Sequence, residues 1–331
     1  MRRNKAFAAL AALSAALVFS VLLSLLVGAV PLTLPEILKG LANPASASGQ
    51  IVLSVRLPRL AAALLAGMAL SASGLVTQTI LANPLASAGM LGINAGAGLF
   101  AAAAMVIFGA GAMFLLPGAA FLGAAATALL VFGIAKRSGA SRLTLVLSGV
   151  AVSSLMTAGI SALTTCFPSI ILGVRDFQIG GLAGATLGGL APAGVLILVG
   201  LLLVLLFAGN LEILSLGEET ARALGLRAVF WRFFFLLLAS LLSGAAVSFS
   251  GLIGFVGLIV PHCTRLLLPG ANTRTHIAGA LLLGGSFLAL CDTAARTLFA
   301  PFELPVGILI AFLGAPFFLW LILRERRRSH A

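Results

Sequence analysis

Charged residues are scarce in this chain. They make up only 8% of its 331 residues, whereas hydrophobic residues make up 61% and the mean hydropathy is +1.21. A soluble domain carries about 25% charged residues, so water cannot be the solvent for most of this surface. The composition therefore predicts a polytopic membrane protein.

Acidic residues are scarcer than basic ones. The chain has 8 Asp and Glu against 20 Lys and Arg, which gives a net charge of +12. A basic excess of this kind can mark a nucleic-acid binder. In a chain this apolar, we interpret it instead as the signal that orients membrane helices.

Several signatures of chemistry are missing. No GxxxxGK[ST] string occurs, so the chain cannot hydrolyse ATP itself. HExxH, paired acidic motifs and a nucleophile elbow are absent too, which argues against a membrane-embedded enzyme. Cys166, Cys263 and Cys291 form no CxxC pair or disulfide framework. We expect no catalytic residue, metal site or cofactor in this chain.

Long apolar runs are plentiful. A membrane helix needs roughly 17–25 apolar residues, and about ten such runs occur: 7–29, 60–82, 92–110, 114–135, 143–165, 190–208, 229–250, 252–268, 277–298 and 306–323. The first resembles a signal peptide, but it is longer than a 7–15-residue signal core, so we interpret it as a retained helix. The prediction is an all-α fold with about ten transmembrane helices.

The positions of the cations predict the orientation. With the N-terminus inside, fifteen Lys and Arg fall in inside segments and five fall outside, namely Lys39, Arg56, Arg59, Arg175 and Arg296. This split satisfies the positive-inside rule, and an even number of helices places both termini in the cytoplasm. Residues 30–59 and 166–189 are predicted to be non-helical outside loops rich in Pro or Gly.

The inside segment 209–228 differs from the other loops. It is polar, yet it favours a helix from Leu216 to Leu224, with Gly225 as a stop. An amphipathic helix here indicates a docking element. A solvated linker is the alternative.

A short string is repeated within the chain. Residues 67–75 and 244–252 both read G-x-A-x-S-x-S-G-L, and a proline follows nine residues later in each copy, at Pro84 and Pro261. The first copy lies in an inward-running helix and the second in an outward-running one, as in the inverted repeats of transporters. We therefore expect one transmembrane domain, 1–331, with halves at about 60–165 and 229–323. Plain helix packing by Ser and Gly is the alternative explanation.

Several strings, taken in order, resemble the FecCD-type permeases of ABC importers. In the first half these are Arg56–Arg59 (RLPR), Ser73–Gly74, Gln78, Asn83–Ala86 (NPLA) and Leu91–Gly92. In the second half they are Gly251–His262 (GLIGFVGLIVPH), Arg265, Asp292–Arg296 (DTAAR), Glu303–Gly307 (ELPVG) and Leu313–Phe318 (LGAPFF). The likeness spans about residues 50–324.

The resemblance implies a type II ABC importer permease in a bacterial cytoplasmic membrane. Its partners would be a second permease, identical or paralogous, two cytoplasmic ATPases that bind the ATP, and an extracytoplasmic binding protein. The implied cargo is a metal chelate, with iron(III)-siderophore ahead of vitamin B12 and haem.

The resemblance also implies roles for the outside arginines. Arg56, Arg59 and Arg296 would receive acidic residues of the binding protein, where ion pairs fix orientation more than they add affinity. Snorkelling to lipid headgroups is the alternative. For Arg296, an ion pair with Asp292 one turn earlier competes, and Arg296 is the partner that we predict for Asp292.

Two further groups of residues receive roles by resemblance. The ATPase coupling helix would consist of Glu218, Glu219, Ala221, Arg222, Leu224 and Gly225, with the small and apolar residues allowing close docking. The cytoplasmic gate would consist of Asn83, Pro84 and Leu85, with Ser141 as a weaker partner. Pro84 supports a helix end here, because it disfavours helical backbone at the preceding residue.

The polar residues inside the runs have two possible roles. Gln78, Ser73, Ser250 and Asp292 line the pathway or serve helix packing, and His262 is predicted to be a packing residue. Two rival classes remain. A secondary transporter needs an ionisable residue at midplane, which Asp292 alone could supply. A channel needs a charged ring or filter loop, and none is visible.

Overall fold

In the computed structural model, which describes residues 2–28, 30–109, 112–138, 141–299 and 301–329, every regular element is a helix. Each apolar run corresponds to one helix: α1 (Arg2–Leu26), α4 (Leu57–Leu81), α5 (Ile93–Phe108), α6 (Ala112–Arg137), α7 (Arg142–Cys166), α9 (Leu187–Leu206), α12 (Ala228–Ser250), α13 (Val256–Leu267), α14 (Thr273–Ala295) and α15 (Val306–Ser329). Among the described residues, seven spans are long and apolar enough to cross a membrane, and α5, α13 and α15 supply shorter apolar helices.

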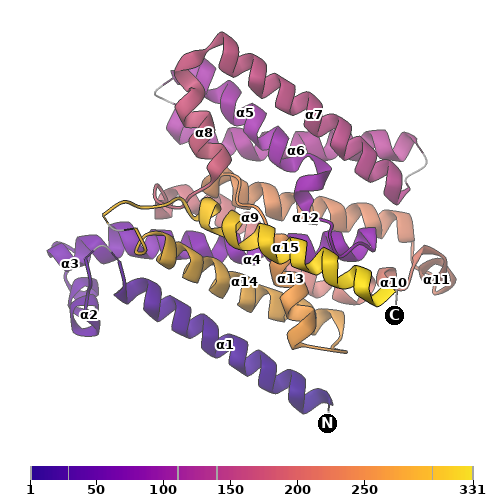
Figure 1. Ribbon diagram of the computed structural model, residues 1–331, viewed down its shortest axis with the longest axis horizontal. Coiled ribbons are helices and arrows are strands. Elements are labelled where there is room, and N and C mark those ends of the chain that lie inside the picture. The colour runs from indigo at the N-terminus through magenta and orange to yellow at the C-terminus, as the bar shows by residue number, and fades with distance from the viewer. Residues whose placement is uncertain (1, 29, 110–111, 139–140, 300, 330–331) are drawn as a thin grey trace.

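The long helices lie side by side in one bundle (Figure 1). Both termini and the short helix α11 (Glu218–Ala223) lie at one end, which we call the termini end. Helices α2 (Leu34–Ala42) and α3 (Ala47–Gln50) lie at the other end, which we call the α2–α3 end. Termini that share one end agree with an even number of crossings.

Two segments expected to be non-helical contain helices. Residues 30–59 hold α2, α3 and a π-helical stretch, η1 (Ile51–Arg56), that runs into α4. Helix α2 starts at a capping box between Thr33 and Glu36, with Pro35 in its first turn, and both features favour a helix start. Residues 166–189 hold α8 (Ile171–Ile179), which ends at Gly180 with φ +75°. The prolines and glycines therefore start and stop short helices here.

The repeated string adopts two different backbones. Its first copy lies inside α4, where a Cβ on Gly74 would overlap the backbone oxygen of Gly257. Its second copy runs off the end of α12, where Gly251 has φ +65° and ends the helix. Glycine is needed in both places, for close packing in one and for backbone freedom in the other.

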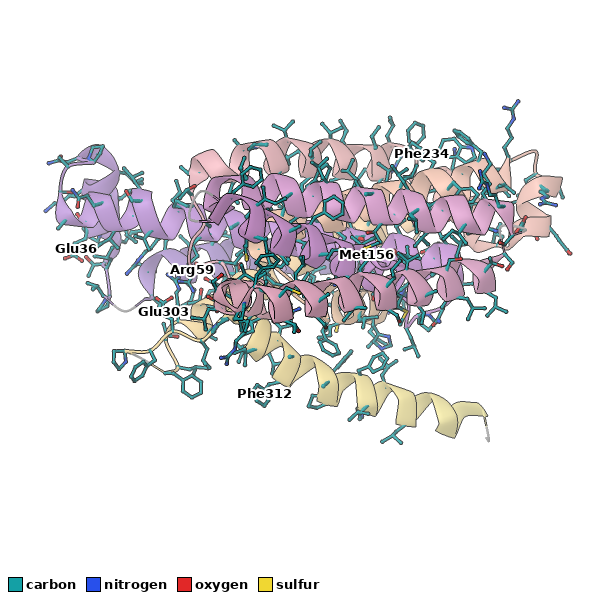
Figure 2. All side chains as sticks on the ribbon, turned by 90° about the horizontal axis from the view of Figure 1, so that it is seen from above. Glu36, Arg59, Met156, Phe234, Glu303 and Phe312 are labelled. Carbon is teal, nitrogen blue, oxygen red and sulfur yellow. The ribbon has the colours of Figure 1, made fainter. Side chains whose placement is uncertain are left out.

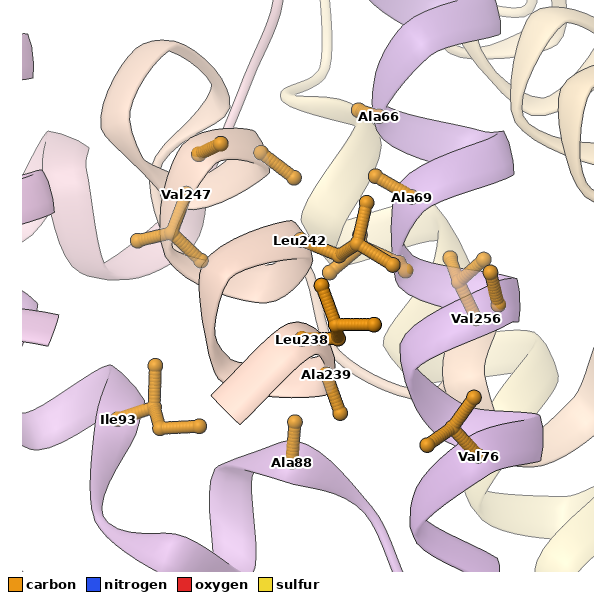
Figure 3. Close-up of a cluster of buried hydrophobic side chains, with 14 of the residues drawn as sticks. Ala66, Ala69, Val76, Ala88, Ile93, Leu238, Ala239, Leu242, Val247 and Val256 are labelled. Atoms are coloured by element: carbon orange, nitrogen blue, oxygen red, sulfur yellow. The ribbon is translucent and has the colours of Figure 1, made fainter. Parts of the chain in front are cut away.

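Small residues let the central helices approach closely. Ala66, Ala69 and Val76 of α4 face Leu238 and Leu242 of α12 across a tightly packed contact (Figure 3). Packing of this kind drives helix association in lipid, where there is no hydrophobic effect between helices.

The periphery is different. In the most apolar 18-residue window of each helix, 78% of the α3–α4 span is buried but only 28% of α7 and 17% of α1. Helices α1 and α7 therefore present large faces to lipid or to another subunit.

Candidate functional site

The three outside arginines predicted to dock a partner lie together at the α2–α3 end. Their side chains point inward: Arg56, Arg59 and Arg296 are only 3%, 6% and 5% exposed. Arg59 Nε donates to both Asp292 oxygens, at 3.0 and 2.9 Å, and its Nη1 donates to Glu303 Oε2 at 2.6 Å. Figure 2 shows Arg59 beside Glu303, with Glu36 further out at the same end.

The predicted pair of Arg296 with Asp292 is present, but Arg59, which the sequence did not indicate, is the closer partner. Arg296 Nε lies 4.0 Å from the Asp292 carboxylate, at the limit of an ion pair, whereas Arg59 bonds directly to it. The tertiary structure explains this difference. Helix α4 packs along α14 and brings the Arg59 guanidinium onto the Asp292 carboxylate, while the Arg296 guanidinium bonds to Ser24.

The other two arginines hold the end of α1. Arg56 donates to the backbone oxygens of Leu25, Leu26 and Val30, and Arg296 donates to the Ser24 oxygen and, at 3.0 Å, to its hydroxyl. The last carbonyls of a helix lack internal partners and carry partial negative charge. Two buried cations therefore cap α1 and tie it to α4 and α14.

The polar residues within the spans are bonded inside the bundle. Gln78 Nε2 donates to Gly257 O at 3.1 Å, and Gln78 Oε1 accepts from Arg265, so it links α4 to α13. Ser73 donates to Ala239 O of α12 at 2.6 Å, and Ser250 donates to Ala246 O of its own helix at 2.9 Å. These bonds correspond to the packing role.

The predicted gate residues lie in two separate places. Helix α4 ends at Leu81, and the Asn83 side chain accepts from Leu85 N at 2.9 Å, which stabilises the turn. Pro84 and Leu85 close against α13 and α15 around a residual hollow of about 10 Å³, next to His262, whose ring packs edge-on against Phe317. Ser141 lies elsewhere: it caps α7 and lines a hollow beside α11.

Helix α11 is a short helix fixed at its base. It begins two residues later than predicted, because Gly217 has φ +104° and separates it from α10 (Ala208–Ser215), and the expected stop at Gly225 is present with φ +80°. Glu218 pairs with Arg222 at 2.5 Å and with Arg232 of α12. Sequence analysis missed Arg232, although a cation four residues into a span signals a partner.

The outer surface of α11 differs from the prediction at one residue. Ala221 is fully buried against its own chain, so it cannot contact a partner. Leu224 is 61% exposed, and a Cβ on Gly225 would meet open space. An exposed leucine beside a glycine, directly after a helix anchored by ion pairs, is a suitable docking surface for another protein.

A stripe of hydroxyls on α7 was also missed. Ser154, Thr157, Ser161 and Thr165 recur at helical spacing, and all four are exposed. Ser154, Ser161 and Thr165 donate to carbonyls one turn earlier, at 2.7–3.1 Å. Their spacing in the sequence is the signal that could have revealed them. These three hydroxyls are satisfied within α7, and together with Thr157 they give the helix a weakly polar exposed face.

These features define a class: a multi-pass helical membrane protein whose buried charges are bonded within the bundle and whose short helix α11 is followed by an exposed surface at one end. The chain belongs to the FecCD transport family, whose model matches residues 16–324. It is the permease subunit of a metal-chelate ABC importer and is not itself catalytic.

Individual relatives agree. The hemin transport system permease HmuU of Yersinia pestis is 40% identical over 286 residues, which cover 84% of each chain. The Fe(3+)-citrate import system permease YfmE of Bacillus subtilis is 35% identical, again over 84% of each chain. An inward-facing structure of a metal-chelate type ABC transporter superposes with a TM-score of 0.84 at 30% identity, covering 96% of this chain and 99% of that one. The predicted type II importer fold is thereby confirmed.

Proposed function

We propose that this chain is half of an ATP-driven import pathway for an iron(III)-siderophore delivered by an extracytoplasmic binding protein. The ATP-driven mechanism is supported by the surface around α11 at the termini end. Leu224 and Gly225 are exposed directly after this helix, and the ion pairs of Glu218 with Arg222 and Arg232 hold the helix in place. The iron(III) chelate is supported by the relatives, one of which is named for Fe(3+)-citrate. Haem, since the other reported relative is named for hemin transport, and vitamin B12 are the alternative cargoes.

In this proposal the termini end faces the cytoplasm, in agreement with the positive-inside distribution of Lys and Arg. Two ATPases dock on α11 of two permeases. Closure of the ATPases on ATP is transmitted through Glu218 to Arg232 in the first turns of α12, because this ion pair links the docking helix to a membrane span.

The pathway would lie between two permeases. Helix α7 offers its hydroxyl stripe to the partner subunit, because polar groups of membrane helices face a bundle interior or a water-filled cavity. Pro84 and Leu85, closed against α13 and α15, form the cytoplasmic gate, and opening it requires these apolar contacts to separate.

The α2–α3 end would receive the binding protein. Arg56, Arg59 and Arg296 remain the proposed docking cations, with one added condition that follows from their burial. The Glu303 side chain is 44% exposed and covers Arg59, so an acidic group of the binding protein reaches Arg59 by displacing Glu303.

An ion-coupled secondary transporter is the alternative of another class, with Asp292 as its coupling residue. The two bonds from Arg59 oppose it, since an ion-binding carboxylate must exchange its partners during transport. The deciding experiment reconstitutes the permease with its ATPase and binding protein in proteoliposomes. We expect uptake to require ATP and to resist an ionophore. Uptake without nucleotide that collapses with the ionophore would establish the carrier.

The cargo is tested separately. The cognate binding protein is purified from cells grown under iron limitation, and its retained ligand is identified by mass spectrometry. An iron(III)-siderophore as the retained ligand supports the proposal. Haem or a corrinoid would identify a different cargo and would not contradict the ATP-driven mechanism.

A further inference from the structure

A basic and aromatic hollow lies at the termini end, beside α11. It measures about 570 Å³ and lies where α6, α11 and the start of α12 meet. Its lining includes the cations Lys136, Arg222 and Arg227, and the apolar side chains of Val229, Phe230 and Phe233. No acidic side chain belongs to its lining within the part of the chain that the structure describes.

The charges of this hollow are not equally available. Arg222 is paired with Glu218 at 2.5 Å, and Glu218 also pairs with Arg232. Lys136 and Arg227 are exposed, and neither forms an ion pair with any described residue. The hollow therefore offers two positive charges without an ion-pair partner beside a third, Arg222, whose counter-ion Glu218 is shared with Arg232.

The apolar residues lie at a depth that suits a lipid. Lys136 comes at the end of the span of α6, and Arg227 immediately precedes the span of α12. Phe230 and Val229 are exposed in the first turn of α12, and Phe233 packs edge-on against Phe132 of α6, with ring centroids 6.0 Å apart. Cations at headgroup depth are thus followed by apolar surface at the depth of acyl chains.

We propose that this hollow binds an anionic phospholipid. Lys136 and Arg227 would hold the phosphate, while Val229, Phe230 and Phe233 would contact the acyl chains. Basic hollows between membrane helices favour anionic headgroups, because each Lys or Arg near the surface contributes to the attraction. The inference does not depend on the cargo, and it does not use Arg222, which the hollow shares with the proposed docking helix. The lipid would bridge α6 and α12 beside the base of α11.

The test uses the full chain in detergent, titrated with phosphatidylglycerol or phosphatidylcholine and followed by native mass spectrometry. We expect phosphatidylglycerol to bind in preference to phosphatidylcholine. Lys136→Ala/Arg227→Ala should weaken phosphatidylglycerol binding about twenty-five-fold, since each cation near a membrane surface contributes about fivefold. Arg274→Ala removes an exposed cation outside this hollow and should leave binding unchanged, as should Lys136→Arg/Arg227→Lys.

Three outcomes would overturn the inference. The first is equal binding of phosphatidylglycerol by the double alanine variant and the parent, with thermal unfolding in the same detergent showing that both are folded. The second is competition by glycerol 1-phosphate at concentrations matching the lipid, which would define a site for free anions. The third is loss of ATPase co-purification by the double variant with lipid binding intact, which would assign the surface to the ATPase.

The aromatic contribution has its own variant. Phe230→Ala keeps both charges and removes apolar contact, so phosphatidylglycerol binding should weaken while the preference for phosphatidylglycerol over phosphatidylcholine persists. Unchanged phosphatidylglycerol binding by this variant would contradict the proposed contact of the acyl chains with Phe230.

Discussion

Two groups of arginines, one at each end of the bundle, are used in opposite ways. At the α2–α3 end, Arg56, Arg59 and Arg296 are buried and bonded to a carboxylate or to helix carbonyls. At the termini end, Arg222 and Arg227 are exposed and border a hollow. A guanidinium removed from solvent needs a partner to offset its desolvation, whereas an exposed one contributes little to stability and is available to other molecules.

The largest effect should come from breaking the buried pair. Asp292→Ala leaves Arg59 and Arg296 without their buried counter-ion, and removing one partner of a buried pair costs about 3–5 kcal/mol. Thermal unfolding of the purified chain in detergent measures this loss. The exposed cation variant Arg274→Ala should unfold like the parent. A combined Arg59→Met/Asp292→Leu variant should recover much of the loss, and an Asp292→Ala protein as stable as the parent would contradict the structural role.

The next effect concerns docking at the termini end. Leu224→Asp places a charge on an exposed position of the proposed interface, so co-purification of the ATPase should fall at least about tenfold, the equivalent of roughly 1.4 kcal/mol. The unfolding temperature should stay unchanged, because Leu224 is 61% exposed. Leu267, which is 51% exposed at the end of α13, provides the matched control as Leu267→Asp. Full retention of the ATPase by Leu224→Asp would remove α11 from the interface.

A smaller effect tests whether Glu303 competes with the binding protein. Glu303→Gln removes the negative charge that covers Arg59, so the binding protein should associate several-fold more tightly, with the gain reduced at high salt. Surface plasmon resonance on the reconstituted permease measures both. Glu36→Gln changes an exposed carboxylate at the same end and keeps its capping box, so it should leave the affinity unchanged. Weaker binding by Glu303→Gln would show that Glu303 itself contacts the partner.

The smallest effect is expected at the exposed ion pair. Arg222→Ala removes an i,i+4 partner of Glu218, and such pairs contribute about 0.3–0.5 kcal/mol. Because Arg232 still binds Glu218, the free energy of unfolding should change by no more than this amount. Arg232→Ala should cost clearly more, since the Arg232 side chain is only 5% exposed. Equal losses for both variants would contradict this ranking.

Part of the site could be predicted from local sequence. Pro84 predicted the end of α4, and Gly225 predicted the end of the docking helix, because each acts on the backbone beside it. Ala221 was assigned to the docking face by composition, yet it faces the chain's own core. Which face of a short helix is covered depends on the neighbouring elements, and the local pattern does not contain that information.

The sequence by itself determined that the chain lies in lipid and contains about ten apolar helices, since transfer to lipid and backbone preference depend on residues close together in the chain. Tertiary structure decided the ion pairs. Arg59 and Asp292 are 233 residues apart, and only the packing of α4 along α14 brings them together. Arg56, Arg59 and Arg296 are therefore buried and bonded within the bundle, whereas the side chains of Lys136 and Arg227 at the opposite end are exposed.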